Sequence, residues 1–332
     1  MTKLTIAKAI NAGLRAAMER DPKVVLCGED VGKLGGVFRI TEHLQKDFGE
    51  HRVMDSALAE SGIIGTSVGM ALRGYRPVAE IQFDGFVYPA FDQIVSQVSK
   101  MHYRSRGKLR LPMVIRIPMG GGIGAVEHHS ESNEAYFAHT AGLRTVFVSN
   151  PEDAYWGIQQ AIESDDPVIF YEPKRRYHER GVLDLGSGPV DLADAPHDLN
   201  DAVVRVEGSD VTVLTYGPML KVALAAAQAS ELEDGPSLEV VDLRSLSPLD
   251  TATIEASVRR TGRCITLSEA QSFSSITAEL AAHVQRECFY DLEAPVVRVG
   301  GYNIPYPPSR HEEVFLPDLD RVLHAVETLM AY

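Results

Sequence analysis

The chain alternates short apolar runs with longer stretches in which apolar residues recur at helical spacing. Near the N-terminus the recurrence is every four positions, which predicts a helix that ends at Asp21-Pro22. Strands are predicted at 24–26, 77–81, 112–117, 145–149 and 167–172, and further helices at 60–73, 91–103 and 152–163. This alternation predicts a largely parallel sheet covered by helices on both faces.

The pattern breaks after about residue 180, where glycine, proline and aspartate accumulate. We interpret residues 181–200 as a linker between a first domain at 1–180 and a second at 201–332. Strands are then predicted at 211–215, 238–243, 264–267 and 295–299, and helices at 219–230, 251–259, 276–287 and 317–330. The predicted fold class is therefore α/β with two domains, and open sheets of this kind bind ligands at the carboxyl ends of their strands.

Length and charge narrow the range of functions. With 332 residues, the chain exceeds what one hydrophobic core usually serves. Its formal net charge of −14, without a long basic run, opposes binding to the phosphate backbone of nucleic acids and suits a basic protein partner.

The cysteines and the N-terminus indicate a cytoplasmic protein. Cys27, Cys264 and Cys288 are odd in number and form no CxxC pair, which disfavours a disulfide framework or a structural zinc site. The first eight residues lack the apolar core of a signal peptide. Because no apolar run approaches the roughly 20 residues that span a bilayer, we expect no membrane association.

Glu60 is the first candidate for chemistry. It opens a predicted helix directly after the strand-like residues 52–55. A carboxylate at this position gains from the helix dipole, which is a purely structural reason for it. Its place at a strand end also suits a general acid or base, and the pattern alone leaves both interpretations open.

The glycine-rich segment 119–125 resembles a dinucleotide-binding turn. That motif requires a following helix and an acidic residue about 20 positions later, whereas the polar residues 127–133 come next. We interpret the segment as a flexible loop that borders a site. Its adjacent His128 and His129 are expected to point to different sides and so not to form a metal centre; they are either solvated or suited to proton transfer near neutral pH.

Aromatic side chains concentrate at 81–92, where a predicted strand leads into a helix. Such a cluster usually belongs to a core or a subunit interface. Alternatively, one of the rings could stack on a planar heterocycle.

Taken together, these segments resemble the beta subunits of 2-oxo acid dehydrogenases, in the transketolase-like family. The block at 80–95 and the run Glu172-Pro173-Lys174 are most similar to branched-chain members. The similarity extends in order along essentially the whole chain and is carried by residues 26–32, 55–62, 80–95, 129–139, 170–174, 241–244 and 301–307.

The resemblance implies a pyrimidine-binding domain followed by a transketolase C-terminal domain. It also implies an α2β2 heterotetramer with thiamine diphosphate shared between the alpha and beta subunits. The implied reaction is oxidative decarboxylation of a branched-chain 2-oxo acid with acylation of a lipoyl domain. The alternatives are a pyruvate or acetoin dehydrogenase beta subunit, a non-catalytic structural subunit of such a complex, and a self-sufficient α/β enzyme.

The resemblance also assigns roles to residues. Glu60 matches the glutamate that hydrogen-bonds the aminopyrimidine ring of the cofactor, and Leu58 the residue that helps to hold the cofactor bent. Gln82 is implied to lie near the pyrimidine and Phe86 to stack on it. His129, which precedes a serine as in the family, matches the histidine that contacts substrate or assists acyl transfer to lipoamide.

Two further acidic residues enter by the same matching. Glu29, which we count with the cofactor-binding residues, and Asp92 match residues that line a proton path between the two active sites. Branched-chain relatives often carry Tyr in place of Phe86, so a hydroxyl contact is lost here while stacking survives.

Metal sites are implied to lie mostly outside this chain. Thiamine enzymes hold magnesium and diphosphate through a Gly-Asp-Gly motif that this sequence lacks, so the magnesium ligands are expected on the alpha subunit. Many relatives bind potassium near the segment matching 161–166. Ser164 stands where aspartate is usual and Val114 where a hydroxyl residue can ligate, which leaves a potassium site open. The acidic C-terminal domain is expected to dock on the lipoyl-bearing acyltransferase core.

Overall fold

The computed structural model describes residues 2–183 and 191–332, so residues 184–190 of the predicted linker lie outside the described residues. The chain divides into two compact units. Unit 1 comprises Met1–Met119 and Tyr136–Leu199, and unit 2 comprises Gly120–Ala135 and Asn200–Tyr332. The glycine-rich loop therefore groups with the second half of the chain, although it follows a strand of unit 1 in sequence.

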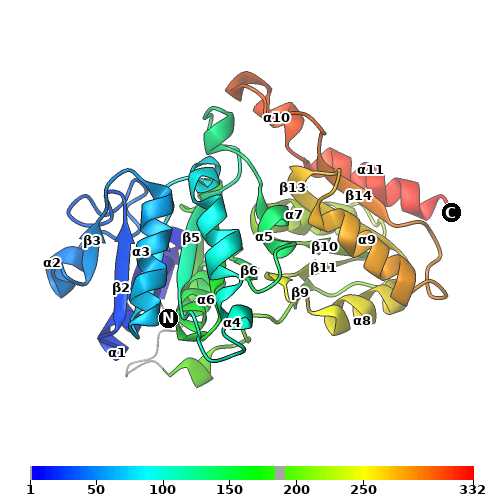
Figure 1. Ribbon diagram of the computed structural model, residues 1–332. Coiled ribbons are helices and arrows are strands. Elements are labelled where there is room, and N and C mark those ends of the chain that lie inside the picture. The colour runs from blue at the N-terminus through cyan, green and yellow to red at the C-terminus, as the bar shows by residue number, and fades with distance from the viewer. Residues whose placement is uncertain (1, 184–190) are drawn as a thin grey trace. The chain divides into compact units, whose positions relative to one another are not determined.

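Unit 1 is built on a parallel sheet, as the alternating pattern predicts (Figure 1). Its strands follow the order β6-β7-β5-β4-β2-β3, and every neighbouring pair runs parallel. The strands are β2 (Val24–Gly28), β3 (Val53–Asp55), β4 (Arg76–Glu80), β5 (Val114–Met119), β6 (Arg144–Phe147) and β7 (Val168–Pro173).

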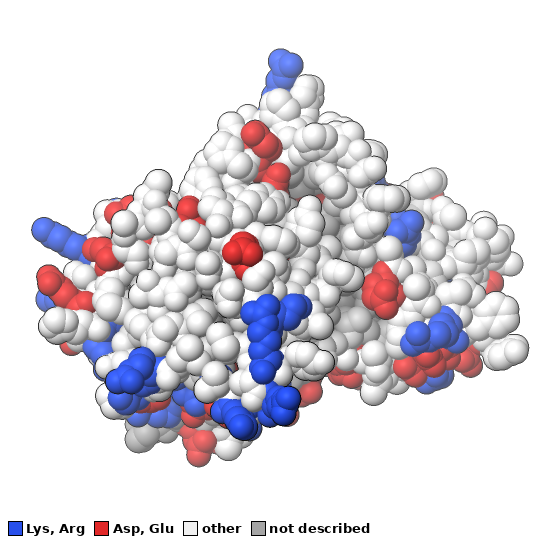
Figure 2. Space-filling model, viewed as in Figure 1, with Lys and Arg blue, Asp and Glu red and all other residues white. Residues whose placement is uncertain are grey.

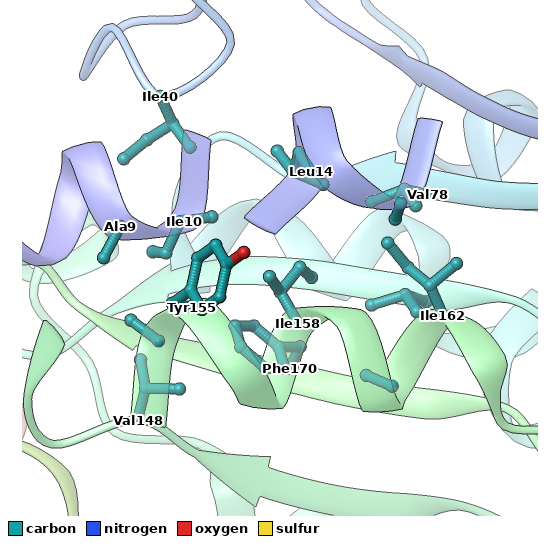
Figure 3. Packing of buried hydrophobic residues seen from close by; sticks show 14 of the residues in the cluster. Ala9, Ile10, Leu14, Ile40, Val78, Val148, Tyr155, Ile158, Ile162 and Phe170 are labelled. Carbon is teal, nitrogen blue, oxygen red and sulfur yellow. The ribbon is translucent and has the colours of Figure 1, made fainter. Parts of the chain in front are cut away.

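Helices α1 (Ile6–Arg20) and α6 (Pro151–Glu163) cover one face of this sheet, and α3 (Glu60–Leu72) covers the other (Figure 1). Their starts follow from local sequence. The Thr5 hydroxyl accepts the N–H of Lys8 at 3.2 Å and caps α1. Figure 3 shows apolar side chains of α1 directed toward those of α6; the labelled ones include Ile10, Leu14, Tyr155 and Ile158.

The prediction of one helix at 91–103 is wrong. The chain instead forms a three-ten helix at Asp84–Ala90, a π-helix at Gln93–Val98 and a separate short helix α4 (Met101–Arg104). Ser99 lies at the break, where its hydroxyl donates to the carbonyl of Val95 at 2.8 Å and its amide to that of Ile94 at 3.0 Å. The serine side chain thus competes with the regular helical ladder.

The first residues of the predicted linker are also ordered differently. Strand β8 (Arg180–Leu183) pairs antiparallel with β1 (Thr2–Thr5). Local sequence patterns could not predict this pairing, because β1 and β8 lie at opposite ends of the first domain in sequence. The remaining short helices of this half are α2 (Leu44–Phe48) and α5 (Glu134–Ala138).

Unit 2 contains a five-stranded sheet in the order β14-β13-β10-β11-β9. All pairs are parallel except β9 with β11, which is antiparallel and was not predicted. The strands are β9 (Val203–Val206), β10 (Val211–Thr215), β11 (Leu238–Asp242), β13 (Cys264–Gln271) and β14 (Val297–Gly301). A short strand β12 (Ser245–Ser247) follows β11 in sequence and is not part of this sheet.

Helices cover both faces of the second sheet, with α7 against α11 and α8 against α9 (Figure 1). They are α7 (Leu220–Leu232), α8 (Thr251–Thr261), α9 (Ile276–Glu287), α10 (Glu312–Phe315) and α11 (Leu319–Met330). These bounds confirm the two-domain α/β class. Among the described residues, no helix combines the length and the apolar character that crossing a membrane requires.

Candidate functional site

Three adjacent parallel strands of unit 1 bring candidate residues together. Glu29 follows β2, Glu60 begins α3 just after β3, and Gln82 follows β4. Because parallel strands share one carboxyl edge, all three residues lie at that edge. The Gln82 amide nitrogen lies 3.4 Å from the backbone oxygen of Glu29 and 3.5 Å from Oδ2 of Asp30.

Glu29 and Glu60 are electrostatically coupled. Burial raises the pKa of the Glu29 carboxyl above its ordinary value, and the negative charges of Glu60 and Asp30 raise it further. Its Oε1 atom is buried and has no hydrogen-bond partner within the described residues. Glu60 itself is only half-buried. The edge therefore pairs an accessible carboxyl with a buried one that resists ionisation.

Leu58 projects from the turn between β3 and α3. The turn is held at its start, where the amide of Ser56 donates to the carbonyl of Gly28 at 2.8 Å, and again where Ala59 donates to Ala57 at 2.8 Å. Leu58 is 82 % exposed in this chain. An apolar side chain presented beside a carboxylate suits contact with a ligand that has both apolar and polar parts.

Phe86 belongs to a chain of aromatic contacts. Its ring meets Phe83 edge-on with centroids 5.6 Å apart, and Phe83 meets Phe38 edge-on at 5.4 Å. Phe86 is half-buried. A partly accessible ring of this kind can stack on a planar heterocycle.

Beneath the edge lies a buried ion network that the sequence interpretation missed. Arg116 of β5 donates from Nη1 to Glu80 Oε2 of β4 at 2.5 Å. It also donates from Nε and Nη2 to the two carboxylate oxygens of Glu172 in β7, at 2.6 and 2.9 Å. Tyr177 donates its hydroxyl to Glu172 at 2.7 Å. The available signal was a charged residue in each of three otherwise apolar strands.

A second buried ion pair lies beside the aromatic residues. Lys174 Nζ lies 3.0 Å from Asp84 Oδ1, and both side chains are fully buried. The same ammonium lies 5.4 Å from the centroid of the Phe83 ring. Lys174 belongs to the Glu-Pro-Lys run that carried part of the family resemblance without an assigned role.

His129 lies in the part of the loop that belongs to unit 2. Glu127–His129 form a three-ten turn, in which His128 is exposed and His129 half-buried. The expectation that the two histidines point to different sides is wrong, because their ring centroids are 4.3 Å apart. Consecutive side chains on a three-ten turn are about 120° apart, whereas those of an extended strand point to opposite faces, so the two rings can approach each other here.

The segment proposed for potassium is occupied by a side chain of the protein. Arg76 Nη1 donates to the carbonyl oxygens of Ile162, Glu163 and Ser164 at 2.9, 3.2 and 3.2 Å. The Ser164 hydroxyl donates to the carbonyl of Asp166 at 3.0 Å. These oxygens already interact with a guanidinium and a hydroxyl, so they do not fit an additional cation.

Comparison with known proteins agrees with this architecture. A model described as "Transketolase, pyrimidine binding domain" matches residues 2–179, and one described as "Transketolase, C-terminal domain" matches residues 200–322. A solved structure described as a "Split gene transketolase, inactive beta4 tetramer" has a TM-score of 0.78 over 99% of this chain and 98% of its own. At 23% identity it shows the fold alone.

Curated relatives are more similar. A pyruvate dehydrogenase E1 component subunit beta from Leifsonia xyli subsp. xyli is 54% identical, covering 99% of this chain and 95% of the relative. A 3-methyl-2-oxobutanoate dehydrogenase subunit beta from Mycobacterium tuberculosis is 52% identical (98% and 92%), and a 2-oxoisovalerate dehydrogenase subunit beta from Pseudomonas aeruginosa is 46% identical (99% and 96%). The chain therefore belongs to the transketolase-like family, within the beta subunits of 2-oxo acid dehydrogenases.

Proposed function

We propose that the chain provides half of the active site of a thiamine-diphosphate-dependent dehydrogenase for branched-chain 2-oxo acids. The observation that carries this proposal is the accessible Glu60 carboxylate, held at a carboxyl edge beside the buried Glu29 and the exposed Leu58. The names of the relatives from Mycobacterium tuberculosis and Pseudomonas aeruginosa support the substrate class.

Each residue at the edge receives a distinct task. Thiamine diphosphate, when bound, supplies the electron sink for loss of carbon dioxide from the 2-oxo acid. Glu60 hydrogen-bonds the aminopyrimidine and holds a proton at its carboxylate. Leu58 packs against the cofactor, Phe86 stacks on the pyrimidine, and Gln82 offers its amide beside them.

Glu29 serves as a proton reservoir next to Glu60. Its raised pKa means that it keeps a proton at a pH where an ordinary carboxyl has lost it, so it can exchange that proton with its neighbour. We propose that Asp92, exposed before the π-helix, continues this path toward the second active site. His129 assists acyl transfer to lipoamide.

The missing parts of the site come from the alpha subunit in an α2β2 heterotetramer. A hard cation that bridges phosphates needs oxygen ligands of the Gly-Asp-Gly type, which this sequence lacks. Magnesium and the diphosphate are therefore assigned to the alpha chain. The isolated chain should bind thiamine diphosphate poorly, and tight magnesium-dependent binding by the chain alone would contradict this division.

We propose that this beta subunit needs no potassium at residues 161–166, because Arg76 takes its place on the carbonyls. Replacing potassium by choline should leave the thermal midpoint of the chain unchanged. Arg76→Ala should lower it, because three carbonyls lose their donor. If potassium specifically raised the thermal midpoint of the parent chain, the proposal that Arg76 takes the place of potassium would be wrong.

A catalytic role for Glu60 can be tested in the reconstituted tetramer. Glu60→Gln should reduce turnover by about 10²- to 10⁴-fold, because the amide cannot hold the required proton. Glu50→Gln, a change at an exposed residue, is the matched control. Unchanged turnover in Glu60→Gln would favour a non-catalytic structural subunit.

Pyruvate is the second candidate substrate, favoured by the Leifsonia xyli relative at 54% identity. One methylene in a pocket changes discrimination by only about 1–3 kcal/mol, so the two substrates must be compared directly. Side-by-side turnover of pyruvate and 2-oxoisovalerate by the assembled complex decides between them. A preference for pyruvate would replace the branched-chain assignment.

A further inference from the structure

The glycine-rich loop has a backbone shaped to receive anions. Gly120, Gly122 and Gly124 adopt φ angles of 86°, 84° and 71°, in the left-handed region that glycine tolerates best. Alternating conformations of this kind turn successive amide N–H groups toward one concave side, as in phosphate-binding loops. This geometry explains why the sequence resembles a dinucleotide-binding turn.

The anions at this loop are carboxylates of the same chain. The amide of Gly121 donates to Glu269 Oε1. The amide of Gly122 donates to Glu312 Oε1 at 2.7 Å, and that of Gly124 donates to Glu312 Oε2 at 3.0 Å. Because these amides are already used, the loop is not available to bind a phosphate.

Both carboxylates lie in a protected environment. Glu269 is 3 % and Glu312 is 7 % exposed. Tyr306 donates its hydroxyl to Glu312 Oε1 at 2.6 Å and packs edge-on against Phe315, with ring centroids 5.0 Å apart. Charge-assisted hydrogen bonds are stronger where water is excluded, so these contacts hold the loop firmly.

The same loop carries His129 a few residues further on. Its base is closed by the amide of Gly120, which donates to the carbonyl of Glu131 at 3.1 Å. The amide of His129 donates to the carbonyl of Val126 at 3.0 Å. The backbone of His129 therefore lies between two fixed points of the loop: the glycine amides that bind the carboxylates, and the hydrogen bond from Gly120 to Glu131.

We propose that Glu312 and Glu269 are positioning residues that fix the place of His129 through the glycine loop. The inference rests on the proposed role of His129 in acyl transfer. Glu312 and Glu269 would then affect one step, acyl transfer to lipoamide, without touching the substrate themselves. A purely structural role would instead affect folding, or every step of the reaction equally.

The test uses Glu312→Gln in the assembled heterotetramer, with exposed Glu313→Gln as the neighbouring control. The amide side chain keeps the shape but cannot accept from both Gly122 and Gly124. Amide hydrogen exchange at residues 121–124 should accelerate by about tenfold or more, because losing one charge-assisted hydrogen bond makes local opening of the loop easier by that factor. Acylation of a lipoyl domain should fall by about ten- to a hundredfold, because catalysis is sensitive to small misplacements.

Decarboxylation measured with an artificial electron acceptor should change far less than lipoyl acylation in Glu312→Gln. Unchanged exchange, or a parallel fall of both reactions, overturns the positioning role. His129→Ala separates this failure from failure of the proposed function. If His129→Ala loses acylation but Glu312→Gln acylates normally, the positioning role of Glu312 is wrong and the role of His129 stands. If His129→Ala acylates normally, the proposed role of the histidine itself is wrong.

Discussion

Arg116 shows how a charged residue is accommodated inside an apolar sheet. It is 1 % exposed and is flanked by Glu80 and Glu172 from the two neighbouring strands. Burial raises the pKa of the Glu80 carboxyl, an effect that the positive charge of Arg116 partly offsets. The guanidinium is therefore what allows two carboxyl groups to lie in the core beneath the candidate site.

Removing that guanidinium should be costly. Arg116→Met leaves two buried carboxyl groups without their cation, and we expect a loss of about 3–5 kcal/mol in the free energy of unfolding. The loss should shrink at acidic pH, because burial raises the pKa of the Glu80 carboxyl and favours its neutral form. Urea unfolding at pH 5 and pH 8 measures both effects.

Arg110→Met is the matched control for Arg116→Met. Arg110 lies 2.8 Å from Asp165 in an exposed pair, with side chains 60% and 46% accessible. An exposed pair of this kind contributes about 0–1 kcal/mol, so this variant should unfold almost like the parent. Equal losses in the two variants would show that Arg116 does not stabilise buried charge.

Glu134 makes stability depend on pH. Burial raises the pKa of its carboxyl to about 7, although the hydroxyl of Tyr216 donates to it at 2.7 Å. Below pH 7 the folded chain therefore holds a proton here that the unfolded chain releases near pH 4.5. Since the folded state binds more protons in this window, its stability falls as pH rises through it.

Glu134→Gln should remove this dependence, because the amide is neutral and still accepts from Tyr216. Relative to the parent, the variant should gain roughly 2–3 kcal/mol between pH 5 and pH 8. Urea unfolding of both chains across this range provides the measurement. A constant difference at all pH values would mean that the Glu134 carboxyl ionises normally in the folded state.

At the scale of the element, helix ends were predictable and helix interiors were not always so. The side chains of Asn150 and Asp250 cap α6 and α8 by accepting N–H groups three residues later, at 3.0 and 3.1 Å. Such signals are local. At the break near Ser99 a second, non-local contact is present, because the backbone at Gly142 packs so closely that a Cβ there would overlap the Ser99 carbonyl oxygen.

The packing of α1 on α6 provides a prediction with an internal comparison. A Cβ at Gly13 in α1 would lie 2.5 Å from Ile158 Cγ2 and 2.7 Å from the carbonyl oxygen of Tyr155. Gly13→Ala should therefore destabilise the chain by about 1–3 kcal/mol through overpacking.

Gly157 in α6 offers the opposite case, because a Cβ there would meet no atom closer than 3.6 Å. Gly157→Ala should leave stability unchanged or raise it by up to about 1 kcal/mol through helix propensity. Thermal unfolding of the two variants measures the contrast. A stabilised Gly13→Ala would show that the two helices can move apart at no cost.

At the scale of the whole molecule, the charge is unevenly distributed along the chain. Residues 201–332 hold 20 acidic and 10 basic side chains, so ten of the fourteen excess negative charges lie there. Residues 93–126 contain six basic side chains and no acidic one. On the face of unit 1 visible in Figure 2, basic side chains gather toward the end that carries α4.

The acidic second half should steer docking to the lipoyl-bearing acyltransferase core. Glu233→Lys, at the C-cap of α7, combined with Glu327→Lys, on the neighbouring helix α11, changes two exposed residues and should slow association by about three- to tenfold at low salt. The difference should vanish near 0.5 M salt, where the Debye length falls to about 4 Å.

Glu19→Lys with Glu50→Lys, two exposed changes in unit 1 that alter the net charge by the same amount, controls for net charge in the docking experiment. Association rates across a salt series, measured with the assembled heterotetramer, provide the comparison. Equal slowing by the control would assign the effect to total charge and remove the case for a docking surface in the second half.

The sequence by itself determined most of the helices and strands, the two-domain α/β class and the place of Glu60 at a strand end. Periodicity, capping residues and strand ends are properties of neighbouring residues, so they can be recognised without knowing the fold. The family could be recognised from the sequence for the same reason, because each stretch that resembles the family consists of neighbouring residues.

Only the tertiary structure decided which distant residues meet. The coupling of Glu29 to Glu60, the Arg116 network and the contact of Glu312 with Gly122, 190 positions apart, depend on the packing of whole elements. Local propensity carries no information about such pairs. Burial then decided their chemistry, because only in a water-excluded setting does one carboxyl keep its proton and another hold a glycine loop in place.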